Sequence, residues 1–330
     1  YEISACLVGS EMCIRDRTTI VPVGSIFLSL IISYGLMEFV GVFMRPVMKP
    51  IWKTPGRSAI DAVASFVGSY SLALLITNRV YKEGKYTTKE AVIIATGFST
   101  VSATFMVIVA KTLDLMDSWN LYFWLTVIVT FLVTAITARI YPIRNKSDAY
   151  FENQEGDIEK DIPKDKFKVA FNEGMEVCAN SGTILENVII NLKDGVMLAF
   201  NIGPSLMAIG TLGIVLANHT PIFDWIGYLV YPFTLISGFE EPLLTAKALA
   251  LGIAEMFLPA VLVTKLSFEV KMLVAITCVS EVLFFSASIP CMMATDIPIS
   301  FKDYLIIWFE RVVLSILVSI PLIYLVKVLI

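Results

Sequence analysis

The chain has 330 residues, a net charge of -4 and a mean hydropathy of +0.77, with 57% hydrophobic and only 16% charged residues. A soluble domain carries about 25% charged residues, so this composition excludes an ordinary soluble domain. Several apolar runs exceed the roughly 18 residues expected of a transmembrane span. We therefore predict an all-α polytopic protein of the lipid bilayer, and we expect no nucleic-acid partner.

The sequence lacks the patterns that mark enzymes, metal sites and disulfide scaffolds. The only histidine is His219, and no cysteine forms a CxxC motif or pairs with it at metal spacing. The cysteines are Cys6, Cys13, Cys178, Cys278 and Cys291. No Walker loop, GxGxxG motif, nucleophile elbow or HExxH motif occurs. We therefore expect no enzymatic activity, no cofactor and no bound metal.

Residues 1–17 do not resemble a membrane segment. The chain begins at Tyr1, and the stretch from Cys6 to Arg17 is too polar for the apolar region of a signal peptide. It resembles the translated adapter sequence that precedes many environmental gene predictions. We expect residues 1–17 to be such an artefact and the true start to lie near Thr18.

The first predicted membrane repeat covers residues 18–144. Its apolar segments lie at about 20–43, 58–77, 88–113 and 121–141. Basic residues follow the first segment between Arg45 and Arg57, and the second between Arg79 and Lys89. Lysine and arginine are concentrated in cytoplasmic loops, so both stretches are predicted to be cytoplasmic.

Segment 58–77 has basic residues on both sides, and a single crossing cannot place both sides in the cytoplasm. Gly68 near its centre favours a re-entrant hairpin that enters the membrane and returns. The alternative is a plain helix whose small residues allow close packing.

A charged region separates the two halves of the chain. Residues 145–168 carry many charges of both signs, which predicts a mobile cytoplasmic linker. Residues 169–194 place apolar side chains at near-helical spacing, with an interruption at Ser181 and Gly182. This pattern predicts either an amphipathic helix along the membrane interface or a helix packed on the bundle.

The second predicted membrane repeat covers residues 195–330. Its spans lie at about 196–216, 269–289 and 304–328, and a broken apolar region occupies 223–263. The order of segment types repeats that of the first half. At an offset near 180, Asp61 aligns with Glu241, and Thr96 aligns with Thr277. Three crossings and one hairpin per half make an odd number, so the halves are predicted to be inverted repeats.

The clearest candidate site lies in the broken region. The residues that interrupt its apolar sequence are Ser237, Gly238, Glu240, Glu241 and Pro242. A carboxylate in mid-membrane costs about 2.5–3.5 kcal/mol on insertion scales. Non-helical backbone is tolerated there only inside protein or beside a wet cavity. We predict that Glu241 contacts a solute or cation, with Ser237, Gly238 and Glu240 beside it. The alternative is that both acids cap the half-helix beginning at Pro242.

Hydroxyl-bearing spans supply the other candidates for solute or ion binding. Thr277 and Glu281 are four residues apart and share a helix face, and the first half carries a comparable stripe. These candidates are Thr96, Ser99, Ser102, Thr277, Ser280 and Glu281, together with Asp61 and, as secondary choices, Asn201 and Glu255. Arg311, near one end of the last span, is predicted to reach the membrane interface.

Three stretches of the chain resemble a known family. They read TTIVPVGSIF at 18–27, RPVMKPIWKTPGRSAIDA at 45–62 and GFSTVSATFMV at 97–107. The chain is similar there to YjiH-type membrane proteins, which contain a nucleoside-recognition gate domain. This gate domain is shared with concentrative nucleoside transporters, ferrous-iron uptake GTPases and spore-maturation membrane proteins. The resemblance implies a membrane gate, assigned here to the second repeat, and it does not fix the substrate.

Two functions are compatible with these patterns. The first is a secondary transporter or gated permease of the bacterial inner membrane, facilitative or coupled to Na⁺ or H⁺, for a small polar solute such as a nucleoside. The second is a non-transporting gate-domain subunit that assembles with partner proteins through linker 145–168. A metal-ion permease is disfavoured, since paired histidines and cysteines are missing from the sequence. A homo-oligomer is compatible with either function.

Overall fold

The computed structural model describes residues 34–154, 156, 166–180 and 220–329, with isolated positions between 183 and 215. Within these residues the fold is helical throughout, apart from one antiparallel bridge between Thr87 and Tyr150. The predicted all-α class is therefore confirmed. Residues 1–17, most of 20–43, half of 181–194, most of the span 196–216 and Asn201 lie outside the described part.

Helix α2 runs from Leu36 to Trp52 and includes most of the basic stretch that we expected to follow a span. The expectation that the helix ends near Phe43 is wrong, because Pro46 and Pro50 remain inside it. Each proline removes one helical N–H donor. At the C-terminal end, Arg139 donates to the carbonyl oxygen of Pro50 at 2.8 Å and so satisfies a group without a helical partner. The 3-10 turn η1 (Gly56–Ser58) follows.

Helices α3 (Ala59–Val67) and α4 (Tyr70–Lys82) form the first hairpin, interrupted at Gly68. Thr77 of α4 donates to the Asp61 carboxylate of α3 at 2.7 Å, although the two residues are 16 apart in the chain. In a straight helix that separation would be about 24 Å. The chain therefore reverses direction within 58–77, as predicted, whereas the depth of this hairpin in a bilayer stays a prediction.

Helices α5 (Thr88–Gly97) and α6 (Ala103–Thr112) replace the single span expected at 88–113. Residues 98–102 between them are not helical. Ser102 accepts a hydrogen bond from the Phe105 backbone N–H at 3.4 Å and so caps the start of α6. A side chain that caps a new helix competes with continuation of the preceding one, and this accounts for the interruption.

The described part of the linker, 145–154, lies against the beginning of α5. The backbone N–H groups of Thr88 and Lys89 donate to the carbonyl oxygens of Ala149 at 2.8 Å and Ser147 at 3.0 Å. The first N–H groups of a helix have no partner within the helix, so these bonds satisfy two of them. The prediction of a mobile linker is wrong for these residues, which include the 3-10 turns η3 (Ile143–Asn145) and η4 (Phe151–Asn153).

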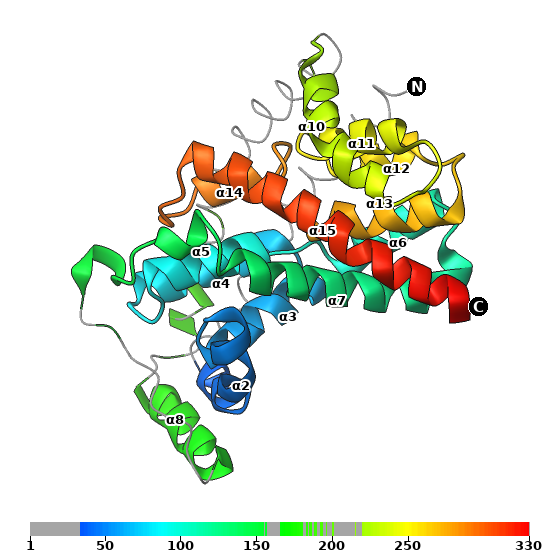
Figure 1. The fold of residues 1–330 in the computed structure, drawn as a ribbon. Coiled ribbons are helices and arrows are strands. Elements are labelled where there is room, and N and C mark those ends of the chain that lie inside the picture. The colour runs from blue at the N-terminus through cyan, green and yellow to red at the C-terminus, as the bar shows by residue number, and fades with distance from the viewer. Residues whose placement is uncertain are drawn as a thin grey trace.

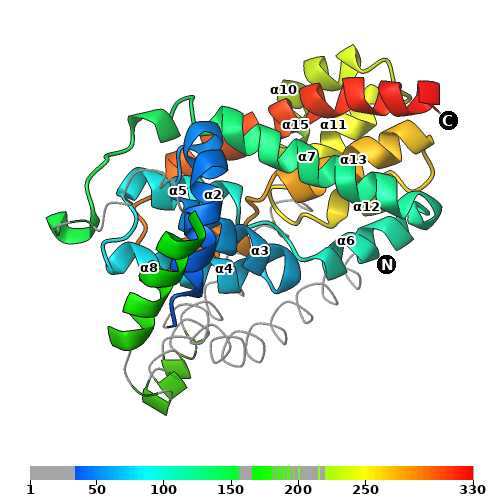
Figure 2. The same ribbon diagram turned by 90° about the horizontal axis from the view of Figure 1, so that it is seen from below.

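Helix α8 (Lys166–Asn180) covers the first part of the predicted amphipathic helix and packs on α2 at the edge of the molecule (Figures 1 and 2). Arg45 of α2 forms an ion pair with Glu173 of α8 at 2.6 Å. Phe171 and Met175 are exposed on the same helix. Helix α8 packs on the bundle, as one alternative predicted. It also presents apolar side chains outward, as the other alternative, an amphipathic helix along the membrane interface, requires.

Helices α10 (Ile222–Ile236) and α11 (Pro242–Leu251) form the second hairpin. The Thr234 hydroxyl donates to the carbonyl oxygen of Pro242 at 2.7 Å, close to the turn. Farther from the turn, a Cβ on Gly227 would lie 3.0 Å from the Cα of Lys247. These two contacts pair the helices in antiparallel order, and glycine permits their close approach. The break predicted in 223–263 is therefore a chain reversal.

Residues 281–287 interrupt the span expected at 269–289, which is divided into α13 (Phe268–Ser280) and α14 (Ser288–Met293). The backbone N–H groups of Phe285 and Ser286 donate to the carbonyl oxygens of Ile253 at 2.6 Å and Ala254 at 3.0 Å. The interrupted stretch therefore obtains its hydrogen bonds from the segment that follows α11. The short helix α12 (Leu258–Leu262) lies in the chain between that segment and α13.

The long helices α7 (Trp119–Thr137) and α15 (Phe301–Leu329) match the spans predicted at 121–141 and 304–328. The short turn η2 (Met116–Ser118) precedes α7. Among the described residues, these are the two helices long and apolar enough to cross a membrane. They pack on each other and on α13 in the middle of the molecule, while α10 and α8 lie at opposite ends (Figures 1 and 2).

The order of elements recurs along the chain. A helical hairpin, an interrupted helix and a long helix follow one another in α3 to α7 and again in α10 to α15. The opposite orientation of the two halves in a bilayer stays a prediction.

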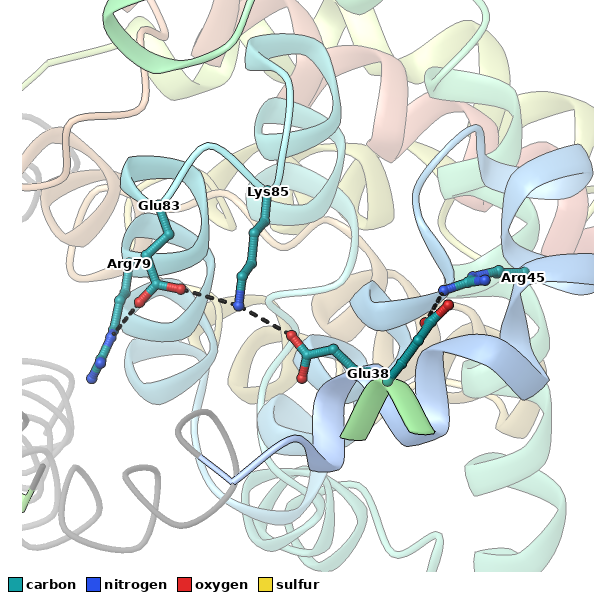
Figure 3. A network of polar contacts seen from close by, with 6 residues as sticks. Glu38, Arg45, Arg79, Glu83 and Lys85 are labelled. Atoms are coloured by element: carbon teal, nitrogen blue, oxygen red, sulfur yellow. Dashed lines mark hydrogen bonds and ion pairs between the residues drawn. The ribbon is translucent and has the colours of Figure 1, made fainter. Parts of the chain in front are cut away.

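A chain of charged side chains holds the base of the first hairpin to α2. Figure 3 shows Lys85 between two carboxylates, at 3.0 Å from Glu38 of α2 and 3.3 Å from Glu83. Arg79 of α4 pairs with Glu83 at 3.0 Å. Isolated surface ion pairs contribute little, but Glu38 is buried and the pairs share partners, so they act as a network.

Candidate functional site

Buried polar side chains gather where the two interrupted helices end. Helix α5 ends at Gly97 and α13 ends at Ser280. The last carbonyl groups of a helix lack partners within it and carry a partial negative charge. Side chains from α3, α7 and α15 contact these ends, each at most 3% exposed. We name this group the interior polar cluster; it comprises Ser65, Thr100, Thr134, Ser280, Glu281, Trp308, Arg311 and Ser315.

The first hairpin supports the non-helical stretch between α5 and α6. The Ser65 hydroxyl of α3 lies 2.8 Å from the carbonyl oxygen of Phe98 and 3.1 Å from that of Thr100. The Thr100 hydroxyl lies 2.9 Å from the Ser65 hydroxyl. Oxygen atoms grouped on non-helical backbone offer acceptors to a hydroxyl, an amide or a hard cation.

Glu281 begins the non-helical stretch after α13 and is fully buried. Its Oε2 accepts a hydrogen bond from the Trp308 indole N–H at 3.2 Å, whereas Oε1 has no hydrogen-bond partner among the residues that the structure describes. The carboxylate lies against Gly252, where a Cβ would be 2.5 Å from Oε2. Only a residue without a side chain leaves room for the carboxylate there.

Helix α15 presents three polar side chains to the end of α13. Trp308, Arg311 and Ser315 are spaced by three and four residues, so they share a helix face. The Ser315 hydroxyl donates to the Ser280 hydroxyl at 2.7 Å, and Arg311 Nε donates to the Ser280 carbonyl oxygen at 2.7 Å. Helix α15 thus supplies the donors that the end of α13 lacks.

Thr134 of α7 connects the ends of both interrupted helices. Its hydroxyl lies 3.1 Å from the carbonyl oxygen of Gly97 and accepts a hydrogen bond from Arg311 Nη1 at 3.1 Å. Gly97 has no room for a side chain, because its Cα faces the Thr134 methyl group. The same hydroxyl lies 2.7 Å from the Thr130 carbonyl oxygen of its own helix, so its one proton is shared between the Thr130 and Gly97 carbonyl groups. Since Arg311 also binds Ser280, a short path of polar contacts joins the last residue of α5 to the last residue of α13.

The cluster contains one buried acid and one buried base that act on each other without forming an ion pair. Glu281 and Arg311 interact electrostatically. Among the described residues, the hydrogen-bond partner of the carboxylate is Trp308. Glu281 Oε1 and Arg311 Nη2 have no partner in the described part of the chain. A free acceptor and a free donor in a buried cluster can be satisfied by a polar solute or by water.

The predicted hydroxyl stripes occupy matching places but bond mainly to their own helices. Thr96 donates to the carbonyl oxygen of Val92 at 2.7 Å, and Thr277 donates to that of Leu273 at 2.8 Å. Each threonine stands near the end of its half-helix. Ser99 lies 3.5 Å from the carbonyl oxygen of Ile94, and Ser102 caps α6.

Glu240 and Glu241 are exposed and lie away from the interior polar cluster. Glu240 Oε2 accepts a hydrogen bond from the Ser267 backbone N–H at 3.0 Å, at the beginning of α13. Helix α13 has 13 residues and is therefore about 20 Å long, with Glu281 at its other end. Glu240 thus caps a helix, although the helix is α13 and not α11. A contact of either acid with a solute stays a prediction.

Residues between the two helices of the second hairpin form its turn. Gly238 has a φ of +64°, which an L side chain rarely adopts. The Ser237 hydroxyl donates to the carbonyl oxygen of Thr234 at 2.6 Å, and the Tyr324 hydroxyl of α15 donates to the Ser237 carbonyl oxygen at 2.7 Å. These contacts place the turn beside the C-terminal end of α15.

Asp61 is fully buried at the start of α3, where it accepts hydrogen bonds from Thr77 and Tyr86. Its alignment with Glu241 is wrong, because Glu241 lies in the turn of the second hairpin and Asp61 lies two helical turns before the reversal of the first. The carboxylate stands one turn before Ser65, so it fixes the helix that contacts the interrupted stretch after α5.

Sequence reasoning missed several members of the cluster, and its prediction for Arg311 is wrong. Arg311 is 0% exposed and does not reach the interface. The polar stripe at 308, 311 and 315 within an apolar helix was an available signal. Ser65 and Thr134 gave none, because single hydroxyls in apolar helices commonly bond to their own backbone. Within the described ranges, no group of three or more His, Cys, Asp or Glu residues is placed to hold a metal ion.

Comparison with known proteins identifies the first half of the chain most clearly. Residues 18–116 match the Gate family, described as nucleoside recognition, which confirms the resemblance for these residues. This match lies in the first repeat, and the assignment of a gate domain to the second repeat stays a prediction. An uncharacterized protein of Alkalihalophilus pseudofirmus is 33% identical over 294 residues, which cover 88% of this chain and 63% of that protein. The chain therefore spans less than two thirds of this relative.

The fold has a counterpart among solved structures. A variant of CNTnw in an outward-facing state superposes with a TM-score of 0.66 at 14% identity, over 93% of this chain and 74% of that one. CNTnw in an inward-facing substrate-bound state gives a TM-score of 0.46 at 12% identity. The first comparison shows that this chain shares the helical fold of that structure.

Proposed function

We propose that this protein is a multi-pass transporter or gated permease of the bacterial inner membrane for a small polar solute of the nucleoside type. The observation that carries the proposal is the interior polar cluster at the ends of two interrupted helices. Interrupted helices in transporters place backbone polar groups and helix ends around a solute. Burying charged side chains inside a membrane protein is costly, and where they occur they commonly mark a functional site. The cluster is therefore the candidate binding region.

The cluster suits a solute that presents both donors and acceptors. Glu281 Oε1 is a free acceptor for a hydroxyl or N–H, and Arg311 Nη2 is a free donor for a carbonyl or ring nitrogen. A nucleoside offers ribose hydroxyls and a base edge with both kinds of group. The match of residues 18–116 to a nucleoside-recognition family supports the same class.

Fewer observations support a particular coupling ion or the alternative function. The oxygens around Ser65 and Thr100 provide acceptors for Na⁺, and buried acids provide sites for H⁺, so coupling to either ion belongs to the proposal. A non-transporting subunit that docks through the linker gains no support from 145–154, because that part is engaged with α5.

Uptake by reconstituted protein tests the function. Proteoliposomes containing the full chain are given labelled uridine or adenosine under an inward Na⁺ gradient, an inward H⁺ gradient or no gradient. We expect uptake above that of empty liposomes, reduced about tenfold or more in Glu281→Gln, because a lost hydrogen bond to a charged group costs 1.5–3 kcal/mol. The exposed Asp224→Asn variant is the matched control and should transport like the original chain. Absence of nucleoside uptake under all three conditions would contradict the proposal.

A further inference from the structure

Arg311 is the largest fully buried side chain among the described residues. It lies in the middle of α15, within an apolar segment that includes Val312, Val313 and Leu314. A buried guanidinium loses its hydration, and this loss is offset only by well-placed hydrogen bonds or opposite charge. The identity of its partners therefore shows what the charge does.

The partners of Arg311 are the ends of two half-helices. Nε donates directly to the carbonyl oxygen of Ser280, the last residue of α13, at 2.7 Å. Nη1 donates to the Thr134 hydroxyl at 3.1 Å. That hydroxyl lies 2.7 Å from the carbonyl oxygen of Thr130 in its own helix and 3.1 Å from that of Gly97, the last residue of α5, so Arg311 reaches α5 through Thr134. Both helix ends carry partial negative charge, so a cation at this point stabilises both.

Glu281 does not account for the position of Arg311. The two side chains form no ion pair within the described structure, and the carboxylate instead accepts from Trp308. The guanidinium thus contacts the last carbonyl group of α13 directly and the end of α5 through the Thr134 hydroxyl. In many transporters the C-terminal ends of half-helices coordinate a dissolved cation. In this chain a covalently attached cation occupies the corresponding position.

We propose that Arg311 is a positioning residue, a tethered cation that holds together the C-terminal ends of α5 and α13 and so fixes the geometry of the interior polar cluster. Its importance for transport rests on the proposed function. Its effect on the two helix ends does not, and the experiment below measures that effect without transport.

The experiment compares thermal unfolding of purified full-length variants in detergent. Arg311→Ala and Arg311→Met remove the cation, and Arg311→Lys keeps the charge but loses the planar fork. Breaking a buried charge interaction of this kind lowers the unfolding temperature by about 5–10 °C. We expect such a loss for alanine and methionine and an intermediate value for lysine.

Free guanidinium separates a cation site from simple packing. At about 20 mM it is too dilute to denature, because unfolding free energy falls in proportion to molar denaturant. We expect it to restore at least half of the lost unfolding temperature in Arg311→Ala, and we expect equimolar urea, its neutral analogue, to restore none. Arg139→Ala is the matched control. Its guanidinium also binds helix carbonyls, at 2.6 and 2.8 Å, but at an exposed place, so added guanidinium should not restore it.

Each outcome bears on the proposal. Unfolding of Arg311→Met at the original temperature would overturn it, as would equal restoration by urea and guanidinium or equal restoration of Arg139→Ala. If the alanine and methionine variants do not fold, a folded lysine variant supports the tethered cation, and a lysine variant that fails with them overturns it. Uptake is measured separately, so a chain that transports no nucleoside still gives a decisive unfolding result.

Discussion

At the scale of single residues, Glu281 is fixed by contacts on two sides. Trp308 donates to one carboxylate oxygen at 3.2 Å, and Gly252 lies against the carboxylate on another side. The remaining oxygen, Oε1, has no hydrogen-bond partner within the described ranges. A carboxylate held in this way presents one acceptor in a constant position, and this is the property that a solute-binding group requires.

Gly252→Ala tests whether this confinement is real. A Cβ at position 252 would lie 2.5 Å from Oε2 and 2.6 Å from Oε1 of Glu281, so the carboxylate must shift, and this disturbs its hydrogen bond from Trp308. Overpacking of this kind costs about 1–3 kcal/mol. We expect a lower unfolding temperature and reduced nucleoside uptake.

The matched control for Gly252→Ala is the double variant Gly252→Ala with Glu281→Ala. If the clash is with the carboxylate, the alanine at 252 should cost almost nothing once the Glu281 side chain is removed, and the two effects should be non-additive. Additive losses of stability would show that Gly252 serves some other contact.

At the scale of elements, tyrosine hydroxyls attach both hairpins to the rest of the bundle. In the first hairpin, the Tyr86 hydroxyl donates to Asp61 Oδ2 at 2.8 Å, and both groups are fully buried. In the second hairpin, the Tyr324 hydroxyl donates to the carbonyl oxygen of Ser237 at 2.7 Å, and Tyr324 is 43% exposed. The two hydrogen bonds therefore differ in burial and in the charge of the acceptor.

Tyr86→Phe is expected to destabilise the protein more than Tyr324→Phe. Removing the donor to a buried carboxyl group costs about 1.5–3 kcal/mol, whereas a hydrogen bond to a neutral, half-exposed carbonyl contributes about 0.5–1.5 kcal/mol. Thermal unfolding of the two variants measures the difference. An equal loss in both, or a smaller loss for Tyr86→Phe, would mean that the hydrogen bond from Tyr86 to Asp61 does not attach the first hairpin to the bundle.

The hairpins were predictable from the sequence, whereas the other two interruptions were not. Gly68 and the group from Ser237 to Pro242 are local breaking signals, and the chain reverses at both. Residues 98–102 and 281–287 carry no proline and no glycine, and their polar residues suggested a solute contact instead of a break in the helix. Their non-helical backbone depends on distant partners, such as Ser65 for Phe98 and Ile253 for Phe285, which periodicity does not show.

The same limit applies to the candidate site. Glu281 and Ser280 were identified because a carboxylate and a hydroxyl in an apolar span are unusual. Arg311 was placed at the interface because long basic side chains near helix ends commonly extend there. Its burial depends on the ends of α5 and α13 meeting beside α15, and this is a property of the folded chain.

At the scale of the whole molecule, the two halves repeat their order of elements with a shift in register. Thr96 and Thr277 occupy matching places at an offset of 181, and each bonds to the fourth preceding carbonyl. The hairpin turns at Gly68 and Gly238 are separated by 170 residues instead. A single offset near 180 therefore aligned the interrupted helices correctly and misplaced the hairpin residues, including the pair of Asp61 and Glu241.

Helix α15 relates the two ends of the molecule and provides the last test. It has 29 residues, so it is about 43 Å long and exceeds the roughly 30 Å thickness of a bilayer core. At its N-terminal end, Lys146 pairs with Asp303 at 2.6 Å, and Lys82 pairs with Asp296 at 3.1 Å. At its C-terminal end, Lys327 pairs with Glu269 at the beginning of α13 at 2.6 Å.

If α15 crosses the membrane, Lys82 and Lys265 lie on opposite sides. An inverted arrangement of the two halves also places Lys82 and Lys265 on opposite sides, because the first hairpin then enters from the cytoplasm and α13 begins outside. Single cysteines at Lys82 and Lys265, in a background with the five native cysteines replaced by serine, are treated with an impermeant maleimide in right-side-out and inside-out vesicles. We expect labelling of Lys82→Cys from the cytoplasmic side and of Lys265→Cys from the other side. Asp148→Cys, next to Lys146 in the chain, should follow Lys82→Cys. Labelling of the cysteines at 82 and 265 from one side would contradict both the crossing of α15 and the inverted arrangement.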